Sequence, residues 1–247
     1  GLEIYALAPG IKINADGIKK SISSPGIGNY ITMASAVNET KQFSNDLKRS
    51  FVIAHGTGTF QNRSTESHVL SSVANGMGLN EWEITGLKGS LGHTMGPAAG
   101  DELMTAIGFW KHGFIPGINT TKKLAEDVYK DNLNFILEDT EKDKESIDAI
   151  YLNAKGFGGN NASAGIISPK IAVDLAKQEF SKAEHLQYEQ NKEKVRESSI
   201  NYQDSCKKGD YGVIYRFNEE VLEGLEDIEI SEEGIRLKGF KAPIKFN

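Results

Sequence analysis

Apolar residues along the chain fall into short strand-like runs that alternate with helical patterns. The runs predict strands at residues 2–13, 52–55, 84–88, 135–137, 149–153 and 162–168. Helical periodicity between them predicts helices at 29–48, 65–76 and 97–110, and the last is apolar enough to be buried nearly all round. Strands that alternate with helices are typical of a layered α/β fold.

The pattern changes near residue 169. Residues 171–198 are charged and helix-prone, and residues 212–217 and 228–238 predict short strands. Residues 219–233 are rich in acidic side chains and contain no basic residue, which indicates a solvated face. We therefore expect an α/β domain over 1–169 and an α+β tail of unassigned role over 170–247.

Composition narrows the classes of function. The 247 residues carry a formal net charge of −6, which gives no broad basic face for nucleic acid. Apolar runs stay well below the ~20 residues of a membrane span, so no membrane partner is expected. Cys206 is the single cysteine, which excludes an internal disulfide framework and a cysteine-based zinc site. A reducing, cytoplasmic location fits this composition.

Two histidines follow predicted strands in glycine-rich segments. His55 lies in Val-Ile-Ala-His-Gly-Thr-Gly-Thr (52–59), and His93 lies in Leu-Lys-Gly-Ser-Leu-Gly-His-Thr-Met-Gly (87–96). In α/β proteins ligands bind at the carboxyl ends of strands. Two neutral imidazoles at that edge can hold one substrate oxygen between them. No third ligand stands at helical spacing, so a metal site is not expected.

Charged residues accompany these histidines. Lys88 lies five residues before His93, at the end of the same predicted strand, and Glu102 lies nine residues after it. Glu102 falls in the predicted buried helix, where a carboxylate needs a cationic partner such as Lys88. Glu66 lies eleven residues after His55, near the start of a helix, where the dipole favours an acid in any case.

A Gly-Phe-Gly-Gly turn at residues 156–159 separates two predicted strands. Backbone N–H groups in such a turn can hold an oxyanion. Neither this turn nor the loop after His55 matches a dinucleotide or Walker phosphate pattern. Each feature alone is better explained by a structural role, since glycines form turns and loop histidines bond carbonyls. Only their order and spacing together indicate a function.

Together these segments resemble the carboxyl-terminal half of β-ketoacyl synthases, the condensing enzymes of fatty acid and polyketide synthesis. The resemblance runs from about residue 5 to residue 168. The family's His-Gly-Thr-x-Thr loop is matched at 55–59, with its glutamate at Glu66, and its Lys-x-x-x-Gly-His segment at 88–93. A glutamate-bearing helix entry is matched at 96–102, a Lys-His-Gly-x-x-Pro-x-x-Asn segment at 111–119 and a Gly-Phe-Gly-Gly-x-Asn turn at 156–161.

The resemblance implies half of a thiolase-like fold: layered helices on a mixed five-stranded sheet, with an extra carboxyl-terminal α+β tail. Residues 1–13 resemble the last strand of the absent amino-terminal half. The reaction implied is a decarboxylative Claisen condensation of an acyl thioester with malonyl-carrier protein. His55 and His93 would act in it with a cysteine on the absent half, supported by Lys88 and Glu102. Cys206 lies in the tail and is no substitute, so the chain alone is expected to be inactive.

Further expectations follow from the resemblance. Phe157, between Gly156 and Gly158, would supply an oxyanion N–H and part of the acyl gate. Supporting roles would fall to Glu66, Thr57, Thr59 and Asn161. No cofactor is implied, because the substrates ride on the phosphopantetheine of an acyl carrier protein. The implied partners are that carrier protein, the amino-terminal half and a second copy in a homodimer.

The chain departs from the family at two positions and leaves other functions open. Arg63 stands where an aspartate is frequent, and Lys155 replaces one of two aromatics at the entrance of the acyl pocket. A non-condensing partner subunit or chain-length factor is one alternative. A carrier-protein docking module is another, with Lys111, Lys122 and Lys123 as its basic spot. Thiolases and chalcone-synthase-like enzymes fit the matched segments poorly.

Overall fold

A computed structural model describes residues 1–17, 26–210, 212 and 224–246. The chain divides into two compact units, residues 1–191 and 192–247, and each is described by itself. The division lies beyond the change of composition near residue 169, because α5 (Pro169–Glu179) and the start of α6 (Lys182–Lys207) belong to the first unit.

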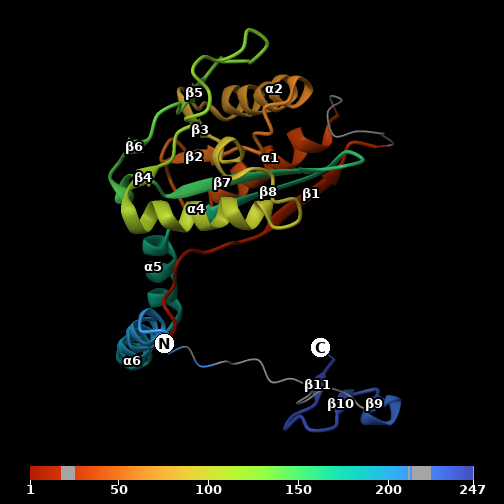
Figure 1. Cartoon of the computed structure of the whole chain (residues 1–247), viewed down its shortest axis with the longest axis vertical. Helices are drawn as coiled ribbons and strands as arrows, with labels where there is room; N and C mark the ends of the chain where they lie inside the picture. The colour runs from red at the N-terminus through yellow and green to blue at the C-terminus, as the bar shows by residue number, and fades with distance from the viewer. Residues whose placement is uncertain (18–25, 211, 213–223, 247) are drawn as a thin grey trace. The chain divides into compact units, whose positions relative to one another are not determined.

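The first unit is built on a mixed sheet of six strands. Their order is β1 (Ile11–Ala15), β8 (Asn160–Ile167), β7 (Ala149–Gly156), β2 (Ser50–Ile53), β3 (Trp82–Thr85) and β5 (Leu133–Phe135). The last four run parallel, whereas β8 and β1 are antiparallel to their neighbours (Figure 1). The α/β prediction is confirmed, with six strands in place of five.

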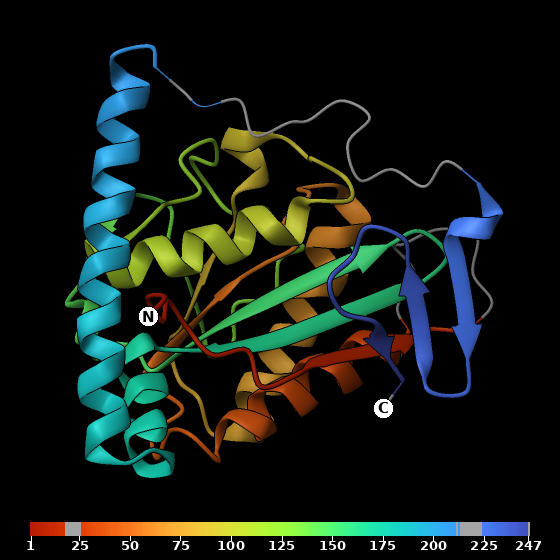
Figure 2. The same cartoon turned by 90° about the horizontal axis from the view of Figure 1, so that it is seen from below.

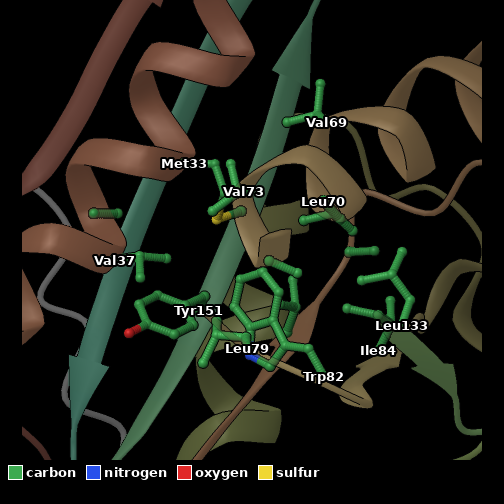
Figure 3. Close-up of a cluster of buried hydrophobic side chains, with 14 of the residues drawn as sticks. Met33, Val37, Val69, Leu70, Val73, Leu79, Trp82, Ile84, Leu133 and Tyr151 are labelled. Atoms are coloured by element: carbon green, nitrogen blue, oxygen red, sulfur yellow. The ribbon is translucent and has the colours of Figure 1, made fainter. Parts of the chain in front are cut away.

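Helices cover both faces of this sheet. On one face, α1 (Gly28–Thr40) and α2 (Phe60–Met77) pack Met33, Val37 and Val73 against sheet residues such as Tyr151 (Figure 3). On the other face, α4 (Ala98–His112) packs against β7 (Figure 2). Its Phe109 packs edge to face against Phe51 of β2. The central strands are therefore buried on both sides, as their continuous apolar runs require.

Several boundaries differ from the prediction. The first strand covers only Ile11–Ala15, because Pro9 cannot donate to a ladder, and residue 7 forms a single bridge to residue 167. The helix predicted over 29–48 ends at Thr40. Helix α4 buries one face only, with Met104 63 % exposed, so burial all round is wrong. Strand β3 ends at Thr85, and Lys88 begins the short helix α3 (Lys88–Leu91) instead of ending that strand.

Smaller elements complete the chain. Strand β4 (Phe114–Ile115) pairs with β6 (Thr140–Glu141), and the 3-10 helix η1 (Lys144–Ser146) follows. In the second unit, η2 (Leu225–Asp227) leads into an antiparallel sheet of β9 (Ile228–Ser231), β10 (Gly234–Leu237) and β11 (Ile244–Lys245). Of the strand predicted at 212–217, residues 213–217 lie outside the described residues. None of the helices in the described ranges is long and apolar enough to cross a bilayer.

Candidate active site

His55 is held in a tight loop between β2 and α2. Strand β2 ends two residues before it, and α2 begins five residues after it. Gly56 and Gly58 have φ values of 55° and 70°, which side chains other than glycine rarely adopt. These two glycines let the chain reverse so closely that the His55 side chain turns into the protein, where the residue is only 2 % exposed.

His93 approaches His55 from the loop that follows α3. Its ring lies edge to face with the His55 ring, with 5.3 Å between centroids and an interplanar angle of 80°. Unlike His55, His93 lies on an exposed stretch of the chain. The structure therefore brings the two sequence-predicted histidines together, one from within the fold and one from its surface.

Both imidazoles have the same tautomer. The backbone N–H of Lys155 donates to Nδ1 of His55 over 3.3 Å, and that of Met95 donates to Nδ1 of His93 over 3.1 Å. A ring nitrogen that accepts a hydrogen bond carries no proton, so a neutral ring must carry its proton on Nε2. Nε2 of His55 is buried and bonds to no described residue. Each ring thus keeps an Nε2–H group to donate.

Glu66 anchors the loop that carries His55. Its Oε1 accepts hydrogen bonds from the His55 N–H (2.8 Å) and from Asn153 (2.7 Å). Its Oε2 accepts from the Gly56 N–H (2.9 Å) and from Asn62 (3.0 Å). Burial alone raises the pKa of this carboxyl. The positive charge of Lys155 and the hydrogen bonds outweigh this effect and hold the pKa of Glu66 below its usual value. Glu66 is therefore a buried carboxylate.

Lys88 and Glu102 form a buried ion pair, and the Lys88 ammonium acts electrostatically on His55. Nζ of Lys88 lies 2.9 Å from Oε1 of Glu102, with side chains 8 % and 1 % exposed. Burial raises the pKa of Glu102 to about 7, although Lys88 acts against the rise. The other carboxylate oxygen, Oε2, is buried and bonds to no described residue. The partnership expected from the sequence is confirmed, with Glu102 far less well solvated than Glu66.

The predicted turn joins β7 to β8. Gly158 and Gly159 have φ values of 82° and 83°, so the turn depends on their lack of side chains. The side chain of Asn161 donates to the Gly159 carbonyl (2.9 Å), and that of Asn160 donates to the Phe157 carbonyl (2.8 Å). Asn161 therefore braces the turn, while Phe157 stands 71 % exposed at its tip.

Arg63 ties helix α2 to the loop at residues 118–128. Its Nε lies 2.9 and 3.2 Å from the two carboxylate oxygens of Asp127, and its guanidinium stacks 5.3 Å from the Phe60 ring centroid. Beneath this loop lies a cavity of about 690 Å³, which Thr57 and Lys88 line together with Lys122, Lys123 and others. The hydroxyl of Thr57 lies 3.3 Å from that of Thr59. The cavity thus adjoins the site.

Two asparagines that the sequence analysis missed complete the site. Asn62 and Asn153 each donate to Glu66, and Asn153 also pairs with Asn29. Asn62 stands four residues before Glu66 on one helix, a spacing that brings side chains together and is visible in the sequence. Asn153 carries no comparable local signal. No cluster of three or more potential ligands for a metal ion occurs among the described residues.

Comparison with known proteins finds relatives among the β-ketoacyl synthases. Residues 5–122 match the family described as the C-terminal domain of β-ketoacyl synthase. The β-ketoacyl-acyl-carrier-protein synthase FabY of Pseudomonas aeruginosa is 38 % identical over the whole chain, which spans 39 % of FabY. The crystal structure of the same ketosynthase superposes with a TM-score of 0.87 at 37 % identity, over 98 % of the chain and 38 % of FabY. The similarity to FabY therefore includes the tail.

Polyketide synthases share less of the chain. The ketosynthase of module 1 of the bacillaene synthase from Bacillus amyloliquefaciens has a TM-score of 0.56 and 26 % identity. The match covers 66 % of the present chain and 30 % of that ketosynthase. The highly reducing polyketide synthase easB of Emericella nidulans is 26 % identical over 74 % of the chain and 7 % of its own length. The chain belongs to the β-ketoacyl synthase family of condensing enzymes and corresponds to the carboxyl-terminal half of its thiolase-like fold.

Proposed function

We propose that this chain supplies the two histidines of a Cys-His-His site for decarboxylative Claisen condensation. In that reaction a malonyl thioester loses carbon dioxide, and the resulting carbanion attacks an acyl thioester. One observation carries the proposal: His55 and His93 lie in ring contact, and backbone N–H groups hold each as the Nε2–H tautomer. Two such groups are able to donate to one thioester oxygen.

The proposed role of the histidines is electrostatic. Loss of carbon dioxide places negative charge on the thioester oxygen of the malonyl group. Donors fixed in advance stabilise that charge more than they stabilise the substrate, and this difference lowers the barrier. The loop built on Gly56, Gly58 and Glu66 supports fixed placement of His55. Neutral rings suit the role, and burial lowers the pKa of His55 to about 4.

The remaining parts of the reaction come from outside the chain. The nucleophilic cysteine is proposed to lie on the amino-terminal half of the synthase, and the substrates to arrive on the phosphopantetheine of an acyl carrier protein. The Phe157 N–H, in the turn braced by Asn161, would join the cysteine N–H in holding the second oxyanion. No resident cofactor is needed for these steps. By itself the chain is expected not to condense thioesters.

A single substitution in a complete synthase, which carries both halves, tests the proposal. His93→Ala removes one donor to the developing enolate and should lower malonyl decarboxylation about 100- to 1000-fold. Loading of an acyl group onto the cysteine should survive, because it does not need that enolate. Radiolabelled carbon dioxide release and mass spectrometry of the acyl-enzyme measure the two steps separately. Decarboxylation at the unaltered rate would remove His93 from this role.

His112→Ala serves as the matched control. His112 is an exposed residue at the end of α4, so its removal should leave both steps unchanged. An unaltered synthase that loads acyl groups but never decarboxylates malonyl would instead favour the alternative of a non-condensing partner subunit.

A further inference from the structure

Lys155 is a buried cation on β7, beside His55. The residue is only 9 % exposed, and its Nζ lies 3.3 Å from Oδ1 of Asn62. Its backbone N–H is the group that donates to Nδ1 of His55. Burying an ammonium group is costly unless an opposite charge compensates it. The position of Lys155 therefore requires a buried anion close by.

Glu66 is one such anion. Lys155 acts on Glu66 electrostatically and helps to keep it ionised. Asn62 connects the two, because its Oδ1 faces the Lys155 ammonium while its Nδ2 donates to Oε2 of Glu66 over 3.0 Å. The side-chain amide of Asn62 has both its oxygen and its nitrogen hydrogen-bonded only when a donor such as the ammonium faces the oxygen and the carboxylate faces the nitrogen.

An isolated carboxylate beside His55 would work against a neutral imidazole. A negative charge within a few ångströms favours the protonated ring. A protonated His55 would direct an Nδ1–H against the Lys155 N–H, so the observed hydrogen bond could not form. Glu66 is nevertheless required, because it holds the N–H groups of His55 and Gly56.

The charges around His55 form two compensating sets. The groups that act on its ring are Glu66 of α2, Lys88 of α3, His93 of the loop after α3, and Lys155 of β7. Glu102 of α4 pairs with Lys88. Each carboxylate is thus matched by one ammonium, Glu102 by Lys88 and Glu66 by Lys155.

We propose that Lys155 is a positioning residue whose ammonium balances Glu66, so that Glu66 can hold the His55 loop while the imidazole stays neutral. The proposal deepens the function proposed above and rests on it. It also accounts for a lysine at a position where the resembling family carries an aromatic residue. The side chain acts through Glu66 and His55 and is not assigned contact with substrate.

The test compares Lys155→Gln with Lys155→Arg in the complete synthase. Gln keeps a donor for Asn62 but removes the charge, whereas Arg keeps the charge. We expect Lys155→Gln to raise the pKa of His55 by about one unit and Lys155→Arg to leave that pKa close to its value in the unaltered protein. NMR titration of 13C-labelled imidazoles measures the pKa in each variant. Lys142→Met, which removes a partly exposed lysine paired with Glu83, should change nothing.

The pH profile supplies a second readout. The neutral ring is the active form, so the rate of malonyl decarboxylation falls as the pH drops through the pKa of His55. With Lys155→Gln this fall should begin about one pH unit higher, while the rate at pH 8 is retained. Lys155→Met provides a second uncharged variant if Gln disturbs the fold.

The possible failures are distinguishable. A His55 pKa that stays unchanged in both uncharged variants would overturn the proposal, whatever the activity. Loss of the folded state in both, with Arg folded, would assign Lys155 a purely structural role and overturn it as well. A His55 pKa that rises as expected in a synthase without any decarboxylation would support the electrostatic role and contradict only the proposed function.

Discussion

Two buried glutamates belong to the candidate site, Glu66 bonded to the His55 loop and Glu102 to Lys88, yet their surroundings differ sharply. Glu66 accepts four hydrogen bonds, and its pKa lies below the usual value. Glu102 has one bond to Lys88, an oxygen with no bond to a described residue, and a pKa raised to about 7. Both are almost fully buried, so the charge of Lys155 and the larger number of hydrogen-bond donors set Glu66 apart. One is solvated by the protein as a carboxylate, and the other depends on a single cation.

The largest expected effect comes from removing the better-solvated carboxylate. Glu66→Ala leaves the N–H groups of His55 and Gly56 without their acceptor and removes the carboxylate next to Lys155. We expect the free energy of unfolding to fall by about 3–5 kcal/mol in urea denaturation at pH 7. Glu83→Ala is the control, because its partly exposed pair with Lys142 contributes less than about 1 kcal/mol. Equal losses in both variants would contradict a special role for Glu66.

A smaller effect is expected when Glu102 loses its cation. Lys88→Met removes the main influence that lowers the pKa of Glu102, so this carboxyl should stay protonated at neutral pH. The loss of unfolding free energy should be about 1–2 kcal/mol at pH 8 and less at pH 6, where Glu102 takes up a proton. Urea denaturation at both pH values measures it. The same loss at both would show that proton uptake by Glu102 does not relieve the missing charge.

The last expected effect is a change in how the free energy of unfolding depends on pH. The folded state holds the proton of Glu102 more tightly than the unfolded state does, because burial raises its pKa from 4.5 to about 7. This carboxyl therefore makes the free energy of unfolding fall as the pH rises from about 4.5 to 7. Glu102→Gln should remove that part of the slope. The difference between the two stability profiles measures it, and parallel profiles would refute the raised pKa.

Local patterns in the sequence predicted the fold class and the approach of His55 to His93. Apolar runs place the strands, and Gly56 and Gly58 place a reversal directly after one of them. The Lys88 and Glu102 pair was predictable because a buried acid needs a cation. These features depend on neighbours in the sequence or on a simple electrostatic requirement.

The surroundings of Glu66 were not predictable in the same way. Its donors come from three separate segments: the loop after β2, helix α2 and strand β7. Their meeting depends on how the layers pack, which no local pattern encodes. The break between α5 and α6 does have a local signal. Ser181 and Glu184 form a capping box, with each side chain accepting from the other's backbone N–H (3.3 and 2.8 Å).

Strand β1 has a practical consequence for anyone who purifies this polypeptide. Among the described strands it pairs with β8 alone, and Ile11 and Ile13 are 66 % and 75 % exposed. An open, apolar border of this kind is a template onto which another strand can add. Preparations of the isolated polypeptide should therefore self-associate at high concentration, and charged replacements at these two isoleucines would keep it dispersed for crystallisation or spectroscopy.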